Sequence, residues 1–321
     1  MKKTALSLAL IAALGLTACS QTNTLQTENN SVQVQQNFAN FSEQFIHDYW
    51  KQFPEHSAWA GYGKYDDIIS IPNQAYRDST LAFANAKLNE LAQFDLDSLP
   101  TAQKTDYYLI ENALKRTIWH SETFKSWQWN PSNYNVSGGF ATILNSRFKT
   151  DHEKFATVLK RLQYVPAYYD AAKANIDNPT LEYTQLAIGQ NKGAFSVLKD
   201  ELLTQVEASN LSSNDKALFV KRFNAAKDAI NGYIDFLTEL EKSLVENGNA
   251  RSFRIGEKLY EEKFTLDIQS GYSAKEMYHK AVADKDRVTS EMVKITDKLW
   301  PKYFPNTERP SKDRDAVAKL I

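Results

Sequence analysis

The sequence predicts a mainly α-helical protein, an irregular multi-helix bundle with long ordered loops. Two observations support this fold class. Apolar residues recur at steps of three and four along most of the 321-residue chain, which is the period of an amphipathic helix. Several of these runs begin at a capping Ser and end at Gly or Pro, as helices do. At most a short β element is expected, near 254–268, where the pattern fits a helix or a strand.

The first expected helix carries an aromatic stripe and stops at Pro54. Its aromatic residues are spaced so that they share one face: Phe38, Phe41, Phe45, Tyr49 and Phe53. The next segment, residues 54–67, contains two glycines and is predicted to be an ordered loop. Helical patterns then cover 73–94 and 101–119, separated by a break at Pro100.

The stretch from Trp127 to Gly139 is rich in aromatic and turn residues and is predicted to be a long structured loop. Loops carry functional residues more often than packed helices do, so the aromatic side chains from Trp127 to Tyr134 are a candidate ligand surface. The alternative is that these residues belong to the core, where aromatic side chains are more often found.

Three long helical patterns follow, and they cover 150–176, 180–208 and 213–246. Pro179 separates the first two, and Gly248 ends the third. Ser212 is expected to cap the third helix rather than to act as a nucleophile, because an apolar helical run follows it directly.

Two helices are expected near the C-terminal end of the sequence. Ser273 and Glu276 have the spacing of a capping box that opens the first of them. Residues 313–321 have the pattern of the start of a helix, and no stop signal or cap follows it. This segment either packs onto the rest of the protein or continues into further polypeptide, because so short a helix is marginal alone.

The first twenty residues, MKKTALSLALIAALGLTACS, have the parts of a bacterial lipoprotein signal. Two lysines precede an apolar run, Ala5 to Leu16, that is too short to span a bilayer. Small residues then precede Cys19, which is the only cysteine of the chain. We therefore predict a cleaved signal peptide at 1–18 and lipidation, with palmitate among the acyl chains, at Cys19.

Lipidation at Cys19 would make the membrane a partner of this protein and place it in the cell envelope. Ser20 stands where Asp would favour retention in the inner membrane, so the outer membrane, on its periplasmic side, is the predicted location. Residues 19–36 are polar and nearly uncharged, which predicts a flexible tether. Residues 37–321 are expected to form one helical domain, the incomplete N-terminal half of a larger one.

Composition excludes two classes of partner or site. The 38 Lys and Arg residues nearly balance the 39 Asp and Glu residues, and no basic cluster indicates binding to nucleic acid. A single cysteine, once lipidated, leaves none for a disulfide or a cysteine-based zinc site.

No metal site is assigned from the sequence. The five histidines lie too far apart for two of them to share one helical face. His152 and Glu153 begin an H-E-x-x-H pattern, but Ala156 stands at the position of the second His. A zinc site built from distant residues stays open as an alternative, for example from His56, Asp66 and Glu257.

No catalytic or cofactor-binding residue is assigned either. No G-x-S-x-G nucleophile elbow is present, and the glycines at 138–139 lack the context of a phosphate loop. Asp66 and Asp67 are adjacent carboxylates that could share acid and base roles, although ion pairing at the surface is the commoner outcome. A carboxylate site around Asp66 and Glu257 stays as a third possibility.

Several segments together resemble a known family. They are PEHSAWAGYGKYD at 54–66, DYYL at 106–109, LAIGQ at 186–190, GEKLY at 256–260 and GYS at 271–273. Their order and spacing over residues 40–300 resemble the N-terminal half of the bacterial domain of unknown function 885 family. Many members of that family carry lipoprotein signals.

The resemblance implies a mostly helical protein related to zinc metallopeptidases. In full-length members, an H-E-x-x-H element lies in the second half of a chain nearly twice this long, where it holds zinc. No residue of the present sequence matches those ligands, so zinc is expected only together with that second half.

Two hypotheses follow for function. In the first, the chain is the scaffold half of a lipid-anchored, metallopeptidase-like protein, has no catalysis of its own and exposes an apolar face that the other half covers. In the second, it is a stand-alone lipoprotein of the cell envelope that binds a ligand, possible peptides included, without catalysis. The open-ended helix at 313–321 favours the first.

Overall fold

The structure is a computed structural model, and it describes residues 32–321. The predicted signal peptide, Cys19 and most of the predicted tether lie outside the described residues. Within the described part the elements are helices, and pairing between extended segments is limited to an isolated bridge of Thr180 with Arg251. The mainly α fold class is confirmed. In residues 32–321, no helix is both long and apolar enough to cross a bilayer.

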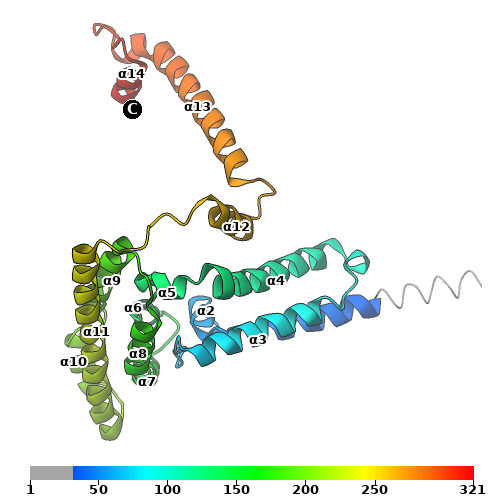
Figure 1. The fold of residues 1–321 in the computed structure, drawn as a ribbon. Coiled ribbons are helices and arrows are strands. Elements are labelled where there is room, and N and C mark those ends of the chain that lie inside the picture. The colour runs from blue at the N-terminus through cyan, green and yellow to red at the C-terminus, as the bar shows by residue number, and fades with distance from the viewer. Residues whose placement is uncertain (1–31) are drawn as a thin grey trace, which may run out of the picture. The chain divides into compact units, whose positions relative to one another are not determined.

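The expected domain at 37–321 contains two compact units, which meet in sequence between Arg254 and Ile255 (Figure 1). The first unit begins with a helix over residues 32–52, which includes the end of the predicted tether. Val34, within that segment, packs against the apolar cluster that this helix helps to form. Partial burial of Val34 favours a helix start earlier than the polar composition indicates.

The first helix packs with two further helices, α3 (Gln74–Leu91) and α4 (Thr101–Trp119), which lie side by side in Figure 1. The aromatic stripe of the first helix faces this cluster, and the ring of Phe38 meets that of Phe94 edge-on at 5.2 Å. Both predicted helices, 73–94 and 101–119, are therefore confirmed.

A larger core surrounds α11 (Ser213–Asn247), which packs most extensively against α7 (Asp151–Leu162), α8 (Val165–Asn175) and α9 (Leu181–Gly193). The inward face of α11 is fully buried and follows the helical period: Phe219, Phe223, Ala226, Ile230, Tyr233 and Leu237. Ser212 caps this helix by accepting a hydrogen bond from the Asp215 N–H at 3.1 Å, as predicted.

Two predicted long helices are divided in the structure. The pattern at 150–176 forms α7 and α8, because Pro166 lacks an N–H and is accommodated in the first turn of α8. The pattern at 180–208 forms α9 and α10 (Glu201–Glu207). Between them the chain turns so that Ala194 and Leu198 are both fully buried.

Two segments predicted as loops contain short helices. Pro54 occupies the first turn of α2 (Pro54–Trp59), where its missing N–H is no loss. The Trp127–Gly139 stretch includes the end of α5 (Ser126–Trp129) and the start of α6 (Ser137–Leu144). The ambiguous segment at 254–268 forms a helix, α12 (Glu257–Ile268), rather than a strand.

The second unit comprises α12, α13 (Ala274–Tyr303) and α14 (Asp313–Leu320). Ser273 opens α13 with the predicted capping box. The last helix packs onto α13, where Ala316 is fully buried and the Trp300 indole N–H donates to the Thr307 carbonyl at 2.8 Å.

One face of α13 carries an apolar stripe along much of its length. Tyr278, Val288, Met292 and Ile295 lie on it and are exposed. Met292 lies four residues after Val288 and three residues before Ile295. This alternation of four and three residues is typical of a helix that pairs with another helix. We call these four residues the α13 stripe.

Candidate functional site: a buried ionic node beside an open groove

The segment that carries the PEHSAWAGYGKYD motif forms α2 and then two tight turns. Gly61 and Gly63 have φ angles of 77° and 79°, in the left-handed region that glycine adopts at no steric cost. Pro54 and Ser57 are buried, and the Ser57 hydroxyl donates to the Pro54 carbonyl at 2.9 Å. These motif residues therefore shape the chain that leads to Asp66.

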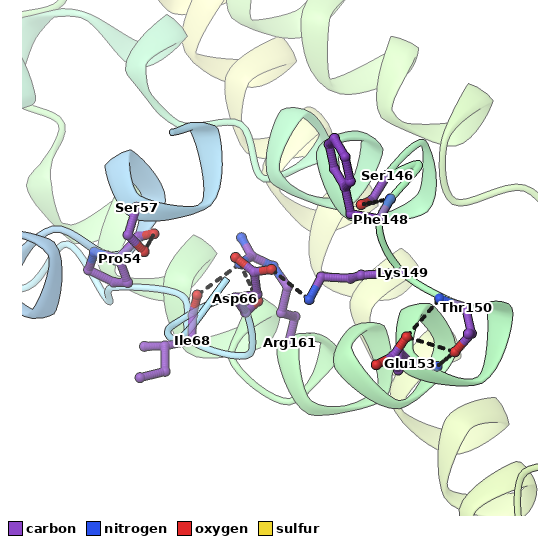
Figure 2. Close-up of polar contacts among 10 residues, drawn as sticks. All are labelled: Pro54, Ser57, Asp66, Ile68, Ser146, Phe148, Lys149, Thr150, Glu153 and Arg161. Atoms are coloured by element: carbon purple, nitrogen blue, oxygen red, sulfur yellow. Dashed lines mark hydrogen bonds and ion pairs between the residues drawn. The ribbon is translucent and has the colours of Figure 1, made fainter. Parts of the chain in front are cut away.

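Arg161 of α7 holds the end of this segment. Its side chain is only 2% exposed, and Nη1 donates to the carbonyl oxygens of Asp66 at 2.8 Å and of Ile68 at 3.0 Å (Figure 2). Burial lowers the pKa of the guanidinium below its ordinary value, while the carboxylates of Glu55 and Asp66 counteract that shift. The charge is thus balanced by neighbouring acids rather than by water.

Gly139 of α6 makes room for this guanidinium. A Cβ atom built on Gly139 would lie 2.4 Å from Nη2 of Arg161, far closer than a van der Waals contact. A Cβ on the preceding Gly138 would meet nothing within 4 Å. The two glycines belong to a helix and not to a phosphate loop, and the second of them permits the buried arginine.

Asp66 is 6% exposed and completes the node. Its Oδ2 pairs with Nζ of Lys149 at 2.9 Å, and its buried Oδ1 has no hydrogen-bond partner among the described residues. Asp67 pairs instead with Lys160 at 3.2 Å on the surface. Because each carboxylate has its own lysine, the two aspartates do not form a pair that shares a proton.

The rest of the segment is anchored on both sides of the node. The Glu55 carboxylate accepts hydrogen bonds from the Ser70 N–H at 2.7 Å and hydroxyl at 3.1 Å. Nδ2 of Asn175 in α8 donates to the Pro72 carbonyl at 2.5 Å. We refer to Asp66, Lys149 and Arg161 as the ionic node.

An open groove of about 820 Å³ lies between the end of α6, the start of α7 and residues 196–210. Its lining includes the apolar side chains of Leu144, Phe155 and Leu202 and three carboxamides, those of Asn145, Gln205 and Asn210. His152 and Lys199 add positive or ionisable groups.

The loop that joins α6 to α7 links the groove to the ionic node. Asn145 lines the groove, and Lys149 of the same loop pairs with Asp66. Thr150 closes the loop, since its N–H and hydroxyl donate to the Glu153 carboxylate at 2.7 and 2.8 Å (Figure 2). These hydrogen bonds lower the pKa of Glu153. Phe148 projects from the loop and is 99% exposed.

The residues considered for a distant metal or carboxylate site belong to different compact units of the chain. His56 and Asp66 belong to the first unit, whereas Glu257 belongs to α12 of the second. The His56 Nδ1 lies 3.1 Å from the Tyr49 hydroxyl, and Asp66 is engaged in the ionic node. Across residues 32–321, no three His, Cys, Asp or Glu side chains gather in a way that could hold a metal.

Of the aromatic candidates from Trp127 to Tyr134, Trp129 and Tyr134 are buried and Trp127 is half-buried. Trp129 and Tyr134 are each 3% exposed, and the Trp129 indole N–H donates to the Phe124 carbonyl at 2.9 Å. Burial raises the pKa of Tyr134 to about 12. The Arg77 guanidinium lies 4.0 Å from the centre of the Trp127 ring. The core alternative therefore holds for Trp129 and Tyr134, while a ligand role for the half-buried Trp127 stays a prediction.

Comparison with known proteins agrees with the fold and the motifs. The family model described as "Bacterial protein of unknown function (DUF885)" matches residues 54–319. A solved structure from Shewanella oneidensis, described as "a putative lipoprotein of unknown function", is 50% identical, with a TM-score of 0.81. The match covers 88% of this chain and 52% of that one, so the present chain spans about half of its length. No curated protein matches. This chain belongs to the DUF885 family of bacterial proteins.

Proposed function

We propose that this chain is the helical scaffold portion of a DUF885 lipoprotein, tethered through lipid at Cys19 to the outer membrane and facing the periplasm. The observation that carries the proposal is the match to only 52% of the solved Shewanella oneidensis chain. The metallopeptidase-like chemistry and the zinc that the family resemblance implies are proposed for the unmatched part of such longer proteins.

The α13 stripe supports a scaffold role. Covering apolar side chains of helix-pairing periodicity with a second apolar surface lowers the free energy, because their apolar area is removed from water. The Shewanella oneidensis chain has a further part that this chain does not match. We propose that a polypeptide equivalent to that part packs on the α13 stripe. Without it, the stripe is a surface through which two copies of the chain associate.

We expect Ile295→Lys to weaken self-association of the chain at least tenfold, because a charge would have to be buried in the contact. Sedimentation velocity over a range of concentrations measures the dissociation constant. Ser290→Lys is the matched control, since Ser290 is exposed on the opposite face of α13 and should leave association unchanged. A parent chain that stays monomeric at every concentration would contradict a pairing role for the stripe.

We expect Cys19→Ser to abolish incorporation of labelled palmitate and to move the protein from the membrane fraction to the soluble fraction. The serine hydroxyl cannot replace the thiol as the lipid acceptor. Ser20→Ala keeps the thiol and should keep both properties. Ser20→Asp should keep lipidation but shift the protein toward the inner membrane. Continued membrane fractionation of Cys19→Ser would refute the lipid anchor.

The groove favours a second candidate function, that of a lipoprotein that binds a small ligand or peptide without catalysis. Ligand sites in proteins are commonly concave and enclose about 300–1,000 Å³. The groove of about 820 Å³, with a mixed apolar and polar lining, falls in that range. This function requires no partner half and is therefore independent of the α13 stripe.

A further inference from the structure

We infer that the groove between α6, α7 and α10 binds a carboxylate joined to an amide, the chemistry shared by the C-terminus of a short peptide and an N-acyl amino acid. This inference rests on the second proposed function, ligand binding.

The floor of the groove suits an aliphatic side chain. Phe155 and Leu202 are 6% and 3% exposed and yet line the groove, so they present small apolar areas at its base. Leu144 is half-buried beside them. An aliphatic group placed on this floor removes apolar surface of both partners from water, which is favourable.

The rim of the groove suits an amide. Asn145 follows the end of α6, Gln205 belongs to α10 and Asn210 follows α10, and all three line the groove. Their side chains make no hydrogen bond with other residues in the 32–321 part of the chain. A carboxamide offers donors and an acceptor together, which is the pattern that a peptide group presents in return.

The charges of the groove select an anion, and they place it at Lys199. Lys154 is already paired with Asp151 at 3.4 Å, so these two charges largely balance. The start of α7 is occupied as well, because the Thr150 and Glu153 side chains cap it. Lys199 is exposed and forms no ion pair with the described residues. Its ammonium is therefore the group that meets a carboxylate.

No unpaired acid among the lining residues competes with a ligand for Lys199. The acid among the lining residues is Asp151, which already pairs with Lys154. A neutral ligand would leave Lys199 unused, and a cationic ligand would face it directly.

The test compares two probes that differ only in charge. N-acetyl-leucine has an aliphatic side chain, an amide and a carboxylate, whereas N-acetyl-leucinamide lacks the negative charge. Isothermal titration calorimetry of the full chain in detergent should give an affinity about tenfold higher for the acid, as a charge-assisted hydrogen bond predicts. Lys199→Gln should remove this preference by weakening acid binding about tenfold and leaving amide binding unchanged.

A matched control separates the role of Lys199 from a general loss of positive charge. Lys192 is an exposed lysine of α9 that does not line the groove. Lys192→Gln should therefore keep the preference for the acid. Because Lys199→Gln is judged by the ratio of two affinities, a partial loss of folded protein does not imitate the expected result.

Three outcomes would overturn the inference. The first is equal affinity of the parent chain for both probes, and the second is an acid preference that survives Lys199→Gln. The third is binding that is unaffected by Asn145→Ala and Gln205→Ala, in which case the protein binds such ligands elsewhere. That third outcome keeps the proposed binding function and rejects only the groove as its site. A failure of this inference is therefore distinguishable from a failure of the proposed function, in which neither probe binds.

Discussion

Arg161→Ala is expected to lower the free energy of unfolding of the first unit by about 3–5 kcal/mol, the usual effect of removing one partner from a buried charged network. The substitution leaves the carbonyls of Asp66 and Ile68 buried without their donor. It also leaves the Asp66 carboxylate, which is 6% exposed, without the nearby guanidinium charge. The contact of the guanidinium with the Phe140 ring, whose centre lies 5.6 Å from Cζ, is lost as well.

Urea unfolding followed by far-UV circular dichroism measures this effect. Lys160→Ala is the matched control, because Lys160 directly precedes Arg161 in α7 and pairs with Asp67 at the surface. An exposed pair of this kind contributes about 0–1 kcal/mol. If the two variants were equally stable, the buried arginine would not be what holds the segment that contains the family motif.

Gly139→Ala is expected to destabilise the first unit by about 1–3 kcal/mol, the typical effect of adding a methyl group to a fully packed site. The new Cβ would lie 2.4 Å from Nη2 of Arg161. An exposed arginine would change rotamer to avoid this clash. Arg161 is held by two hydrogen bonds and is only 2% exposed, so it has no room to do so. Gly138→Ala, at an exposed helical position with open space, should instead stabilise by up to about 1 kcal/mol.

A double-mutant cycle isolates the cause. In the Arg161→Ala background the guanidinium is absent, so Gly139→Ala should cease to destabilise and should behave like Gly138→Ala. The same urea unfolding experiment on four proteins measures the coupling between residues 139 and 161. Additive effects of the two substitutions would show that Gly139 is constrained by something other than the arginine.

The helices that the sequence predicts well are those whose ends are marked by local chemistry. The α4 bounds agree with the prediction because Pro100 fixes its start, and α11 agrees because Ser212 and Gly248 cap it. The divided helices carry weaker marks. Pro166 stands one residue inside α8, where a proline is compatible with helix, so periodicity alone continues across the break.

The ionic node could be predicted only in part. The sequence singles out Asp66 and the 54–66 motif, but it cannot distinguish a buried ion pair from an acid–base pair, because that depends on Lys149. Arg161 leaves one usable signal. It follows the fully buried Val158 by three residues and precedes the fully buried Val165 by four, so it lies on the apolar face of the helical run.

The groove has no sequence signal at all. Its lining comes from residues 141–155 and 196–210, two stretches that look like ordinary helix ends in the sequence. Only the packing of α6, α7 and α10 brings their carboxamides together. Lipidation at Cys19, in contrast, is predicted from a purely local sequence motif. It stays a prediction that membrane fractionation tests.

The structure gives the residues of the family motif at 54–66 a structural role. In residues 54–66 the turn glycines, the buried Ser57 and the paired Asp66 all serve to form and hold a loop. Similarity in this segment therefore indicates a shared shape of the first unit rather than a shared set of reacting groups.

The hydrogen bonds of Arg161 also set an order of folding events during synthesis. The carbonyls of Asp66 and Ile68 are bound by a side chain 95 and 93 residues further along, and Asn175 binds the Pro72 carbonyl across 103 residues. A chain that emerges N-terminus first can form its local helices early, but this loop closes only after α7 and α8 have followed. During that interval the segment stays open to chaperones and proteases.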